Sequence, residues 1–375
     1  MKQLIYISNA VLPSKTANSI HVMKMCNAFF NNGFSVSLIA PKINSECERK
    51  RVFEYYGIEA NFKIFYLSYF RFLPGVTKSI FYSFLAAIFT FNKDAVIYGR
   101  NIIGCLLSIL MGKEVVLELH SPPSKFTKFE QFIFKYTLKR KPMKLVVISN
   151  ALKDILRKEL NGFALNCTIH VHHDGADIPK LNLLKPKEEI DSDTINIGYL
   201  GHLYPGRGIE IIVGMAKQLP AYQFHIIGGE SSDIEYWKTN LESVNIKFHG
   251  HQPPEIAELF RVSMDILLAP YQQVVSISGK GDTSSYMSPL KVFEYMASRK
   301  PFIISDLPVL REVLTDDDCY FVKFDDVSQW VFAVNSILSR GDIAEAKANS
   351  SFDKLLGHYS WLKRADNISK VFRDS

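Results

Sequence analysis

The stretch SPLKVFEYMASRKPFIISD, residues 288–306, indicates the fold of this chain. Its first half spaces apolar residues as an amphipathic helix does, and Pro289 stands where the first helical turn tolerates proline. Its second half, PFIISD, is a short apolar run of the kind that forms a buried strand. A helix that leads directly into a buried strand is typical of α/β proteins with a parallel sheet.

Lys291 and Glu294 interrupt the apolar pattern of this helix. Residues three apart share one face of a helix, so both side chains can meet near its start. One interpretation is an ion pair at the edge of a core helix. The other is a helix N-terminus that holds an anionic ligand, with a carboxylate beside it for hydroxyl groups.

The same alternation of short strands and amphipathic helices runs through the whole chain. It predicts an α/β protein with two Rossmann-like, doubly wound domains that face a central cleft. The helix after the first strand is expected to end at Gly33. Strands are expected at residues 3–8, 34–40, 62–67, 95–98, 114–119, 144–149 and 168–172, and then at 195–201, 222–229, 246–250, 264–270, 301–306 and 319–324.

Two domains are also expected because 375 residues exceed a comfortable single core. Residues 1–180 are predicted to form the first domain, and residues 181–194, which are polar and contain proline, the linker. Residues 195–355 are predicted to form the second domain. Residues 356–375 are predicted to form a helix that returns toward the first domain.

Charge is distributed unevenly along the chain, whose net charge is +6. Residues 1–180 contain 24 Lys and Arg against 12 Asp and Glu, whereas the remaining residues contain 20 and 26. The basic half indicates an anionic surface or substrate as partner.

A cytoplasmic protein is expected from three features. No apolar run reaches the ~20 residues that span a bilayer, and the opening MKQLIYISNA is typical of a first strand rather than a secretory signal. The five cysteines are far apart and form no CxxC pair, which argues against a zinc site or a disulfide framework. They are Cys26, Cys47, Cys105, Cys167 and Cys319.

Two glycine-containing loops of the second half follow predicted strands. Gly201, Gly206, Arg207 and Gly208 occupy the first loop, and the pair Gly228–Gly229 the second. Glycine lets a backbone approach a ligand closely, and an arginine near a helix start can bind phosphate, but a tight structural turn is the favoured interpretation of the first loop taken alone. Neither loop has the GxGxxG or Walker pattern, so nicotinamide or ATP use is not indicated.

The free N–H groups at the start of the 290s helix, together with Lys291, would stabilise a diphosphate. Glu294, one turn further on, could accept hydrogen bonds from ribose hydroxyls. In the first half, His120 follows a strand at its carboxyl end, where it has a functional or a structural role, and Arg100 follows another strand. The turn at Asp174 is interpreted as a hinge.

Two acid pairs resemble a DxD metal motif, Asp191 with Asp193 and Asp316 with Asp318. The first lies in the predicted linker and the second in a polar turn. Both are interpreted as solvated turns, and no obligatory metal or cofactor is expected.

Taken together, these residues resemble the retaining glycosyltransferases of family four, which have the GT-B fold, and in particular those of bacterial surface-polysaccharide synthesis. The resemblance covers nearly the whole chain and is strongest in SPLKVFEYMASRKPFIISDLPVLREVL. Supporting segments, in the family's order and spacing, are LPSKTANSIHVMKMCNAFFNNGFSVSLIA, VVISNALKDIL, VHHDGADI and GYLGHLYPGRGIE.

The resemblance implies a transferase, of hexoses by expectation, that uses a nucleoside diphosphate sugar and retains the anomeric configuration. Glu294 would hold the donor ribose, Arg207 and Lys291 the diphosphate, and His120 would line the sugar site. Further donor contacts are implied for Gly201, His202, Gly228, Gly229, Tyr286, Ser288 and Leu290, and acceptor-side contacts for Asn18, Ser19, His21 and Arg100.

Three positions depart from the family's pattern. Tyr286 replaces the first glutamate of the E-x7-E pair, and His202 stands where a second phosphate-binding arginine is common. Residues 17–19 replace a glycine pair. These departures affect sugar identity and catalytic detail rather than the fold.

Peripheral membrane association is expected from two aromatic and basic stretches in the first half. Residues 64–93 contain Arg71, Lys78 and Lys93 among many aromatics, and residues 124–144 mix aromatics with a basic cluster. Such stretches suit an anionic lipid surface on the inner face of the membrane, although the same residues could form a core and its solvated face.

The expected partners are a nucleotide sugar, with UDP favoured and GDP possible, and a glycan or lipid-linked acceptor of cell-surface polysaccharide or lipopolysaccharide. No nucleic acid is expected, because no recognition motif is present. The alternatives are a nucleotide-sugar epimerase or phosphorylase-like enzyme on a related fold, or a non-catalytic nucleotide- or nucleic-acid-binding protein.

Overall fold

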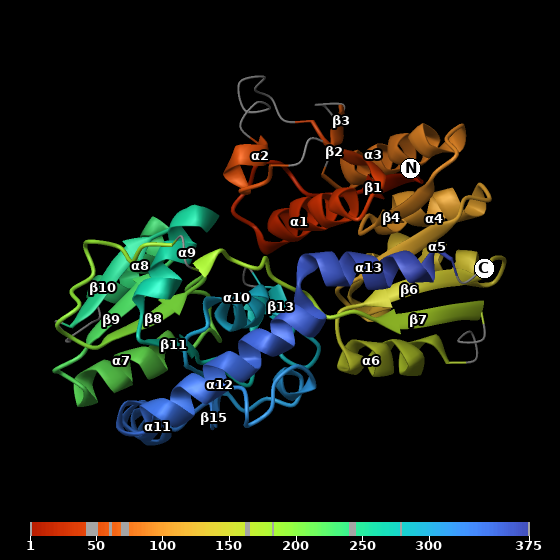
Figure 1. Ribbon diagram of the computed structural model, residues 1–375. Helices are drawn as coiled ribbons and strands as arrows, with labels where there is room; N and C mark the ends of the chain where they lie inside the picture. Colours follow the sequence, from red (N-terminus) through yellow and green to blue (C-terminus); the bar gives the residue numbers. More distant parts are fainter. Residues whose placement is uncertain are drawn as a thin grey trace. The chain divides into compact units, whose positions relative to one another are not determined.

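The computed structural model describes residues 2–42, 52–59, 62–68, 75–161, 166–181, 184–239, 245–277 and 280–373. They form two compact units, each an α/β domain (Figure 1). Unit 1 comprises Met1–Asp174 together with Trp361–Ser375, and unit 2 comprises Gly175–Ser360. Each unit has a parallel sheet with helices on it, so the predicted fold class is confirmed.

Unit 1 contains a seven-stranded parallel sheet in the order β3-β2-β1-β4-β5-β6-β7. Every strand expected in the first half is present, within two residues of its predicted ends. The strands are β1 (Gln3–Ile7), β2 (Ser35–Pro41), β3 (Lys63–Leu67), β4 (Val96–Gly99), β5 (Val115–Leu119), β6 (Met143–Val147) and β7 (Cys167–Val171).

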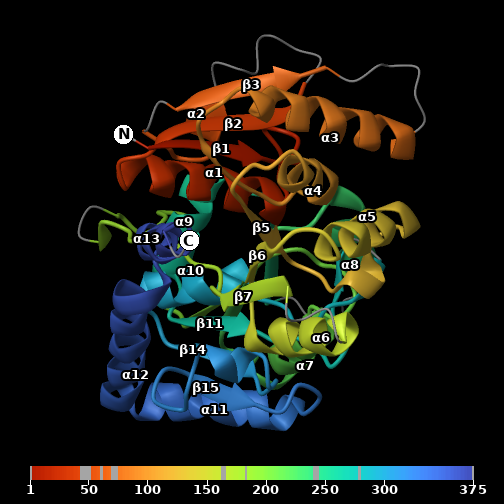
Figure 2. The same cartoon turned by 90° about the vertical axis from the view of Figure 1, so that its right-hand side faces the viewer.

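The helices of unit 1 cover both faces of this sheet. Right-handed crossovers place a helix on opposite faces according to the direction in which the chain moves along the sheet. Consequently α1 and α13 lie on one face, and α3, α4 and α5 lie on the other, with α4 packed between its neighbours (Figure 2). The helices are α1 (Ala17–Asn31), α2 (Val52–Tyr55), α3 (Gly75–Phe91), α4 (Ile102–Leu110), α5 (Lys128–Leu138), α6 (Asn150–Leu160) and α13 (Trp361–Val371).

Local signals set the ends of α1 as the sequence predicts. The Thr16 side chain accepts a hydrogen bond from Ser19 N and caps the start of the helix. Gly33 has a φ of 87°, which turns the chain after the last helical residue. The buried side of α1 includes Met23, Met25 and Phe29.

Unit 2 contains a six-stranded parallel sheet in the order β10-β9-β8-β11-β14-β15, and again every expected strand is present. The sequence did not indicate a small antiparallel hairpin, β12 (Ser276–Ile277) with β13 (Lys280–Asp282). The sheet strands are β8 (Asn196–Leu200), β9 (Gln223–Ile227), β10 (Ile246–Gly250), β11 (Ile266–Ala269), β14 (Phe302–Ser305) and β15 (Tyr320–Val322).

The core of unit 2 is formed between its sheet and two helices, α7 and α11, around the fully buried Trp330. The 290s helix of the sequence is α10, and α9 and α12 pack against it. The helices are α7 (Ile209–Gln218), α8 (Ser231–Thr239), α9 (Pro254–Ser263), α10 (Leu290–Ser298), α11 (Val327–Ser339) and α12 (Gly341–Lys354), followed by a π-helical turn, Leu355–Tyr359.

The first boundary between the units differs from the predicted one. Unit 1 ends at Asp174, whose buried carboxylate contacts His21, whereas Ala176 already donates its N–H to Tyr359 O in unit 2. The described part of the predicted linker belongs to unit 2. There Lys187 donates its backbone N–H to Ser263 Oγ at 2.8 Å. This polar, proline-containing segment therefore packs against unit 2 and is not a free linker.

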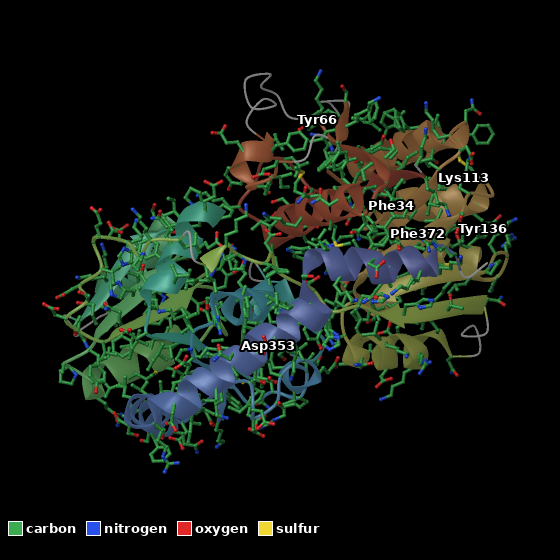
Figure 3. The ribbon with its side chains drawn as sticks, viewed as in Figure 1. Phe34, Tyr66, Lys113, Tyr136, Asp353 and Phe372 are labelled. Carbon is green, nitrogen blue, oxygen red and sulfur yellow. The ribbon has the colours of Figure 1, made fainter. Side chains whose placement is uncertain are left out.

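The C-terminal segment crosses from unit 2 to unit 1 at Ser360, which is extended. The predicted helix over 356–375 is therefore two elements, a π-helical turn and α13. Helix α13 packs on α1, and Phe372 contacts Phe34 with ring centroids 6.1 Å apart (Figure 3).

One interpretation of the acid pairs was wrong. Asp318 is 1% exposed and accepts hydrogen bonds from Thr315 N at 2.7 Å and Ser350 Oγ at 2.9 Å. Lys354 also contacts it, so this carboxylate fixes α12 instead of lying in a solvated turn. Asp191 does form a local turn, because its Oδ1 accepts from Asp193 N at 2.9 Å. Cys47 lies outside the described residues, and the other four cysteines are free thiols.

A chain of hydrogen bonds between neutral groups crosses the sheet of unit 2. His225 Nε2 lies 2.9 Å from Asn196 Oδ1, and His225 Nδ1 lies 2.9 Å from His249 Nε2. The Asn196 amide nitrogen donates to two carbonyls, so its Oδ1 accepts from His225. Burial, and to a lesser extent the nearby His249, lowers the pKa of His225 to about 4. Folding therefore keeps this ring neutral.

Acid should destabilise unit 2 through His225. An unfolded histidine has a pKa of about 6.5, so the unfolded chain binds more protons than the folded chain between about pH 6.5 and pH 4. The free energy of unfolding should fall as the pH falls through this window. Urea titrations at several pH values should show a flatter dependence for His225→Gln than for the wild type. The exposed-site control His358→Gln should keep the wild-type slope, and equal slopes for all three proteins would contradict the assignment.

Candidate functional site

The carboxyl ends of β8 and β11 form the centre of a predicted binding site in unit 2. These strands are neighbours, and from them the chain runs outward in opposite directions, to β9 and β10 on one side and to β14 and β15 on the other. Such a switch point leaves a crevice between the loops that follow the two strands. The loop after β8 carries Gly201 to Gly208, and Tyr271 follows β11.

The glycines of these loops are required by the packing of the protein's own backbone. Gly206 and Gly208 have φ angles of 84° and 75°. A Cβ on them would lie 2.0 Å from Val274 O and 1.9 Å from Pro270 O. A Cβ on Gly228 would lie 2.1 Å from Gly201 O. The loops after β8, β9 and β11 are thus stacked at van der Waals distance, as the structural interpretation of the first loop expected.

Lys291 lies in the first turn of α10 and is 9% exposed. Its Nζ is 3.5 Å from the centroid of the Tyr199 ring and 5.3 Å from that of Tyr271. Burial lowers the pKa of Lys291 well below its usual value, and the nearby charge of Arg207 adds to this effect. Burial therefore disfavours the charge of this amine, whereas the faces of the two tyrosine rings attract it.

Glu294 is not the partner of Lys291, so the ion pair of the structural interpretation does not form. Its Oε2 instead contacts Nη1 of Arg261, from α9, at 3.2 Å. Because this contact comes from another helix, the position of the Glu294 carboxylate is set by tertiary packing. The Glu294 side chain is 31% exposed and can still reach a ligand.

Arg207 provides a second cation beside Lys291. Its Nη2 donates to Ser276 O at 3.4 Å, and its guanidinium lies 5.5 Å from the Tyr271 ring centroid. Its Nε is buried without a hydrogen-bond partner. Within the part of the chain that the structure describes, no acidic side chain forms an ion pair with Arg207 or Lys291. Two adjacent cations without a counter-charge are suited to an anionic ligand.

The remaining predicted donor residues surround this pair. His202 stacks on Tyr204 with ring centroids 4.8 Å apart, and burial, then Arg207 and Lys291, lower its pKa. Tyr286 and Ser288 are buried beside the start of α10, and no side chain caps this helix. Leu290 is half-buried, as is Gly228, and Gly229 is buried.

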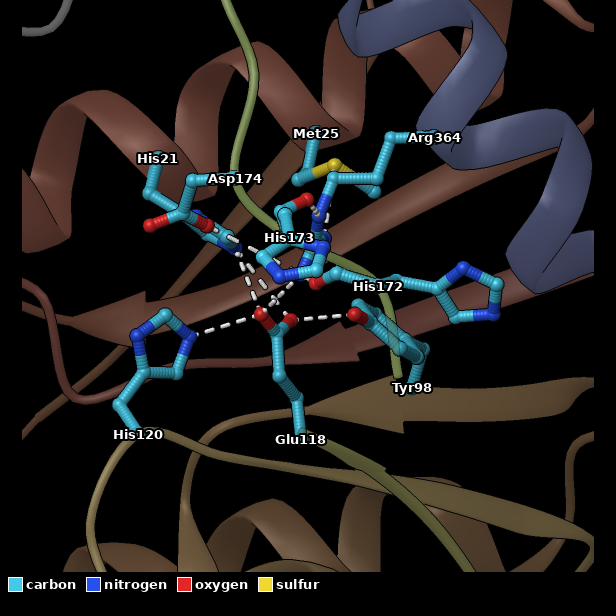
Figure 4. A network of polar contacts seen from close by, with 9 residues as sticks. All are labelled: His21, Met25, Tyr98, Glu118, His120, His172, His173, Asp174 and Arg364. Carbon is cyan, nitrogen blue, oxygen red and sulfur yellow. Dashed lines mark hydrogen bonds and ion pairs between the residues drawn. The ribbon is translucent and has the colours of Figure 1, made fainter. Parts of the chain in front are cut away.

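Unit 1 contains a buried polar cluster around Glu118, a residue of β5 that is 1% exposed (Figure 4). Its Oε1 contacts His120 Nε2 at 2.7 Å, Arg364 Nη2 at 2.7 Å and His21 Nε2 at 3.1 Å. Its Oε2 accepts a hydrogen bond from Tyr98. Four elements therefore meet at one carboxylate: β5, β4, α1 and α13.

The electrostatics of this cluster are balanced. Burial would raise the pKa of Glu118, but Arg364, His21 and His120 hold it well below its usual value. Burial and the Arg100 charge lower the pKa of His120 to about 4. Asp174 joins the cluster through His21 Nδ1 at 3.0 Å. Ionised Glu118 is thus stabilised by donors on all sides, while His120 is neutral.

Four members of the cluster could in principle ligate a metal. Ligand atoms of His21, Glu118, His120 and Asp174 all lie within 4.8 Å of one another. However, the guanidinium of Arg364 already contacts Glu118 at 2.7 Å and lies 3.9 Å from Asp174. A metal ion would have to displace this cation or be repelled by it. The absence of an obligatory metal stays a prediction.

The four predicted acceptor-side residues differ in accessibility. Ser19 is fully buried, and its hydroxyl donates to Ser14 O and Thr16 O, while His21 is 1% exposed and bridges two carboxylates. Both therefore serve the interior of unit 1. Asn18 and Arg100 are half-buried and could meet a ligand.

Sequence reasoning missed Glu118, Asp174 and Arg364 as members of one cluster. One signal was present for Glu118, because a glutamate in the otherwise apolar run VVLEL, two residues before His120, must be buried with a partner. Nothing in the sequence indicated that Arg261 contacts Glu294, because no sequence pattern predicts that α9 packs beside α10.

One comparison with known proteins covers most of unit 2. Residues 194–340 match a family model described as glycosyl transferases group 1. Most of unit 2 is therefore similar to glycosyltransferases of this group. The predicted resemblance is confirmed there, and it supports a transferase enzyme.

The full chain is also similar to solved structures. HepE of Anabaena, solved with UDP, has a TM-score of 0.73 at 13% identity, and both chains are covered completely. Sucrose-phosphate synthase of Thermosynechococcus elongatus has a TM-score of 0.71 at 15% identity, with 100% of this chain and 98% of that chain covered. At such identities the likeness shows the fold alone.

Among curated proteins, the chain is similar to TuaH of Bacillus subtilis (strain 168), which is named a putative teichuronic acid biosynthesis glycosyltransferase. The two are 23% identical over 148 residues, which are 39% of this chain and 35% of TuaH. The match therefore spans about a third of the relative's length.

Replacing Gly208 by alanine should destabilise unit 2 and deform the site. The new Cβ would meet the Pro270 carbonyl oxygen at 1.9 Å, in addition to the cost of a positive φ, about 1–2 kcal/mol. Gly112→Ala is a matched control, because Gly112 has a φ of 82° but nothing within 4 Å of the added Cβ. Urea unfolding should show a clearly larger loss for Gly208→Ala. Equal losses would contradict the close packing of the loop.

Proposed function

We propose that this glycosyltransferase moves a sugar from a nucleoside diphosphate sugar to a hydroxyl group of a glycan or lipid-linked acceptor, with retention of the anomeric configuration. The acceptor belongs to cell-surface polysaccharide synthesis. UDP is the favoured nucleotide, because HepE was solved with UDP and with UDP-glucose. The similarity to TuaH, named for teichuronic acid biosynthesis, supports the class of product.

The observation that carries the proposal is the pair of cations at the carboxyl ends of β8 and β11. Lys291 is buried in an aromatic pocket, and Arg207 lies beside it. A diphosphate at this point would supply the missing negative charge to both. It would also accept hydrogen bonds from the uncapped N–H groups at the start of α10.

The same pair would assist the reaction. When the bond from sugar to phosphate breaks, negative charge grows on the departing nucleoside diphosphate. Cations and N–H groups that are already oriented stabilise that charge without reorganisation. Glu294, held by Arg261, would accept hydrogen bonds from the ribose hydroxyls and orient the nucleotide. The acceptor oxygen would attack on the face from which the diphosphate departs.

Nucleoside diphosphates should raise the melting temperature of the purified protein. A ligand at 100 times its Kd adds about 2.7 kcal/mol to the free energy of unfolding. The shift should occur with UDP, and not with CMP or NAD, and should be lost in Lys291→Met and Glu294→Ala. Without a nucleotide, the Lys291→Met variant should be at least as stable as the wild type, because the substitution removes a buried charge that has no counter-charge.

Arg299→Gln provides the control, since Arg299 is an exposed cation just after the C-terminal end of the same helix. It should keep the full shift. Folded wild-type protein that shifts with no nucleoside diphosphate, or a Lys291→Met protein that shifts normally, would refute the site.

Transfer and epimerisation can be separated in the same preparation. A transferase releases the nucleoside diphosphate when an acceptor is added, whereas an epimerase converts the nucleotide sugar without releasing it. The anomeric proton of the product, observed by NMR, then reports retention or inversion. A product of inverted anomeric configuration would refute the retaining mechanism but not the proposed donor site.

The outer surface of α3, α4 and α5 is a candidate for the expected membrane contact. Helix α5 exposes Phe129, Phe132 and Tyr136, at 41%, 65% and 38%. Tyr136 is labelled in Figure 3. Helix α3 exposes Phe84, Ile88 and Phe91, so these two helices present apolar stripes on either side of α4.

Charge on this face suits an anionic lipid surface. Helix α5 and the residues after it expose Lys128, Lys135, Lys139 and Arg140 among these aromatics. Each cation near an anionic surface contributes about 1 kcal/mol at physiological salt. Among the described residues, no helix has the length and apolar character that crossing a bilayer requires. Arg71 of the predicted stretch lies outside the described residues. Because α3 and α5 expose apolar residues and the α5 region also exposes basic ones, we propose that the protein binds the membrane surface peripherally through these two helices.

Flotation with liposomes should test this surface. The wild type should float with vesicles that contain phosphatidylglycerol and not with pure phosphatidylcholine, and high salt should weaken binding. The double variant Phe129→Ser, Phe132→Ser should lose most of the bound fraction. Phe332→Ser, at a phenylalanine of unit 2 that is 73% exposed, should bind normally. Flotation that ignores lipid charge, or that survives the double substitution, would contradict the proposal.

A further inference from the structure

His120 is the one histidine of the Glu118 cluster that retains appreciable exposure, 21% of its side chain. It follows β5 directly, at the carboxyl end of the strand, and Arg100 follows the neighbouring β4. The carboxyl edge of a parallel sheet is where such domains bind ligands. His120 is therefore the member of the buried cluster that can contact a bound molecule.

The contact with Glu118 restricts His120 to one tautomer. An ionised carboxylate only accepts hydrogen bonds, so His120 Nε2, 2.7 Å from Glu118 Oε1, must carry the hydrogen. Burial and Arg100 lower the pKa of His120 to about 4, so the ring is neutral near pH 7. A neutral imidazole with a hydrogen on Nε2 has a lone pair on Nδ1, which can accept a hydrogen bond.

Arg364 fixes the carboxylate that fixes His120. Its Nη2 contacts Glu118 Oε1 at 2.7 Å and the His172 carbonyl at 3.1 Å, while its Nε donates to the His173 carbonyl at 2.8 Å (Figure 4). Both of these carbonyls follow β7. The guanidinium is thus bound to the sheet edge on one side and to Glu118 on the other.

We propose that Glu118 and Arg364 are positioning residues that hold His120 with its hydrogen on Nε2, so that Nδ1 accepts a hydrogen bond from a hydroxyl group of the bound sugar. The C-terminal helix α13 thereby contributes to substrate recognition, because it carries Arg364. The identity of the ligand as a sugar rests on the proposed function, whereas the tautomer does not.

The chemistry of the group explains why a fixed tautomer matters. A sugar hydroxyl can donate its hydrogen to Nδ1 only while that atom is unprotonated. The other tautomer, or the protonated ring, would place a hydrogen there and remove the acceptor. Because a buried acceptor left unpaired is costly, a sugar that lacks the matching hydroxyl would bind less well.

The first test is the protonation of His120 itself. Long-range nitrogen–proton NMR correlations distinguish the two neutral tautomers of histidine from the protonated ring, and the signal missing in His120→Asn assigns the residue. We expect a neutral ring at pH 7.5 with hydrogen on Nε2. A ring with hydrogen on Nδ1, or on both nitrogens, overturns the proposal whether or not transferase activity has been found.

A variant that is expected to fold tests the roles of Glu118 and Arg364. Removing one charge leaves the other buried and unpaired, but replacing both by apolar residues of similar size is often tolerated. In Glu118→Leu, Arg364→Met we expect His120 to exchange between tautomers. Lys370→Met, which changes an exposed lysine of α13, is the control and should keep the wild-type spectrum.

Kinetics then separate positioning from general support of the fold. The double variant should lose about 10- to 100-fold in kcat/KM, as for other residues that orient a functional histidine. Added to His120→Ala, it should cause no further loss, because its effect passes through the same ring. Losses that multiply would show an independent structural role and would refute the assignment. If no nucleotide sugar is turned over, the proposed function fails while the NMR result still decides the tautomer.

Discussion

The ion pair between Glu118 and Arg364 is the constraint on which unit 1 depends. A buried carboxylate is costly unless donors surround it, and Glu118 has donors from three elements that are far apart in sequence, β4, α1 and α13, as well as from the nearby His120. Breaking such a pair by removing one partner costs about 3–5 kcal/mol. Unit 1 therefore reaches its native arrangement only when α13, which follows unit 2 in the sequence, packs against it.

Unit 2 shows the opposite electrostatic condition. Lys291 and Arg207 lie side by side, and no acidic side chain of the described residues neutralises either by an ion pair. Burial lowers the pKa of Lys291, which means that folding disfavours its charge. Proteins commonly retain such local instability where a ligand completes the site. A diphosphate would restore the balance, so binding and stability are coupled at this point.

The two units therefore differ in the polar groups that they contain. In unit 1, the accessible member of the Glu118 cluster, His120, is neutral and suited to directional hydrogen bonds with hydroxyl groups. In unit 2, the cations Lys291 and Arg207 attract negative charge and tolerate variation in its position.

The sequence by itself determined the strands, the two sheets and the location of the loops that follow β8, β9 and β11. Apolar runs of strand length, the Gly33 stop and the interrupted pattern of α10 are local signals, and local backbone preference decides them. Tertiary structure alone decided the partners: Lys291 on Tyr199 rather than beside Glu294, Glu294 with Arg261, and Arg364 with Glu118. Helical spacing can show that two side chains share a face. It cannot show which distant side chain fills the space opposite, because packing of the whole sheet and its helices sets those distances.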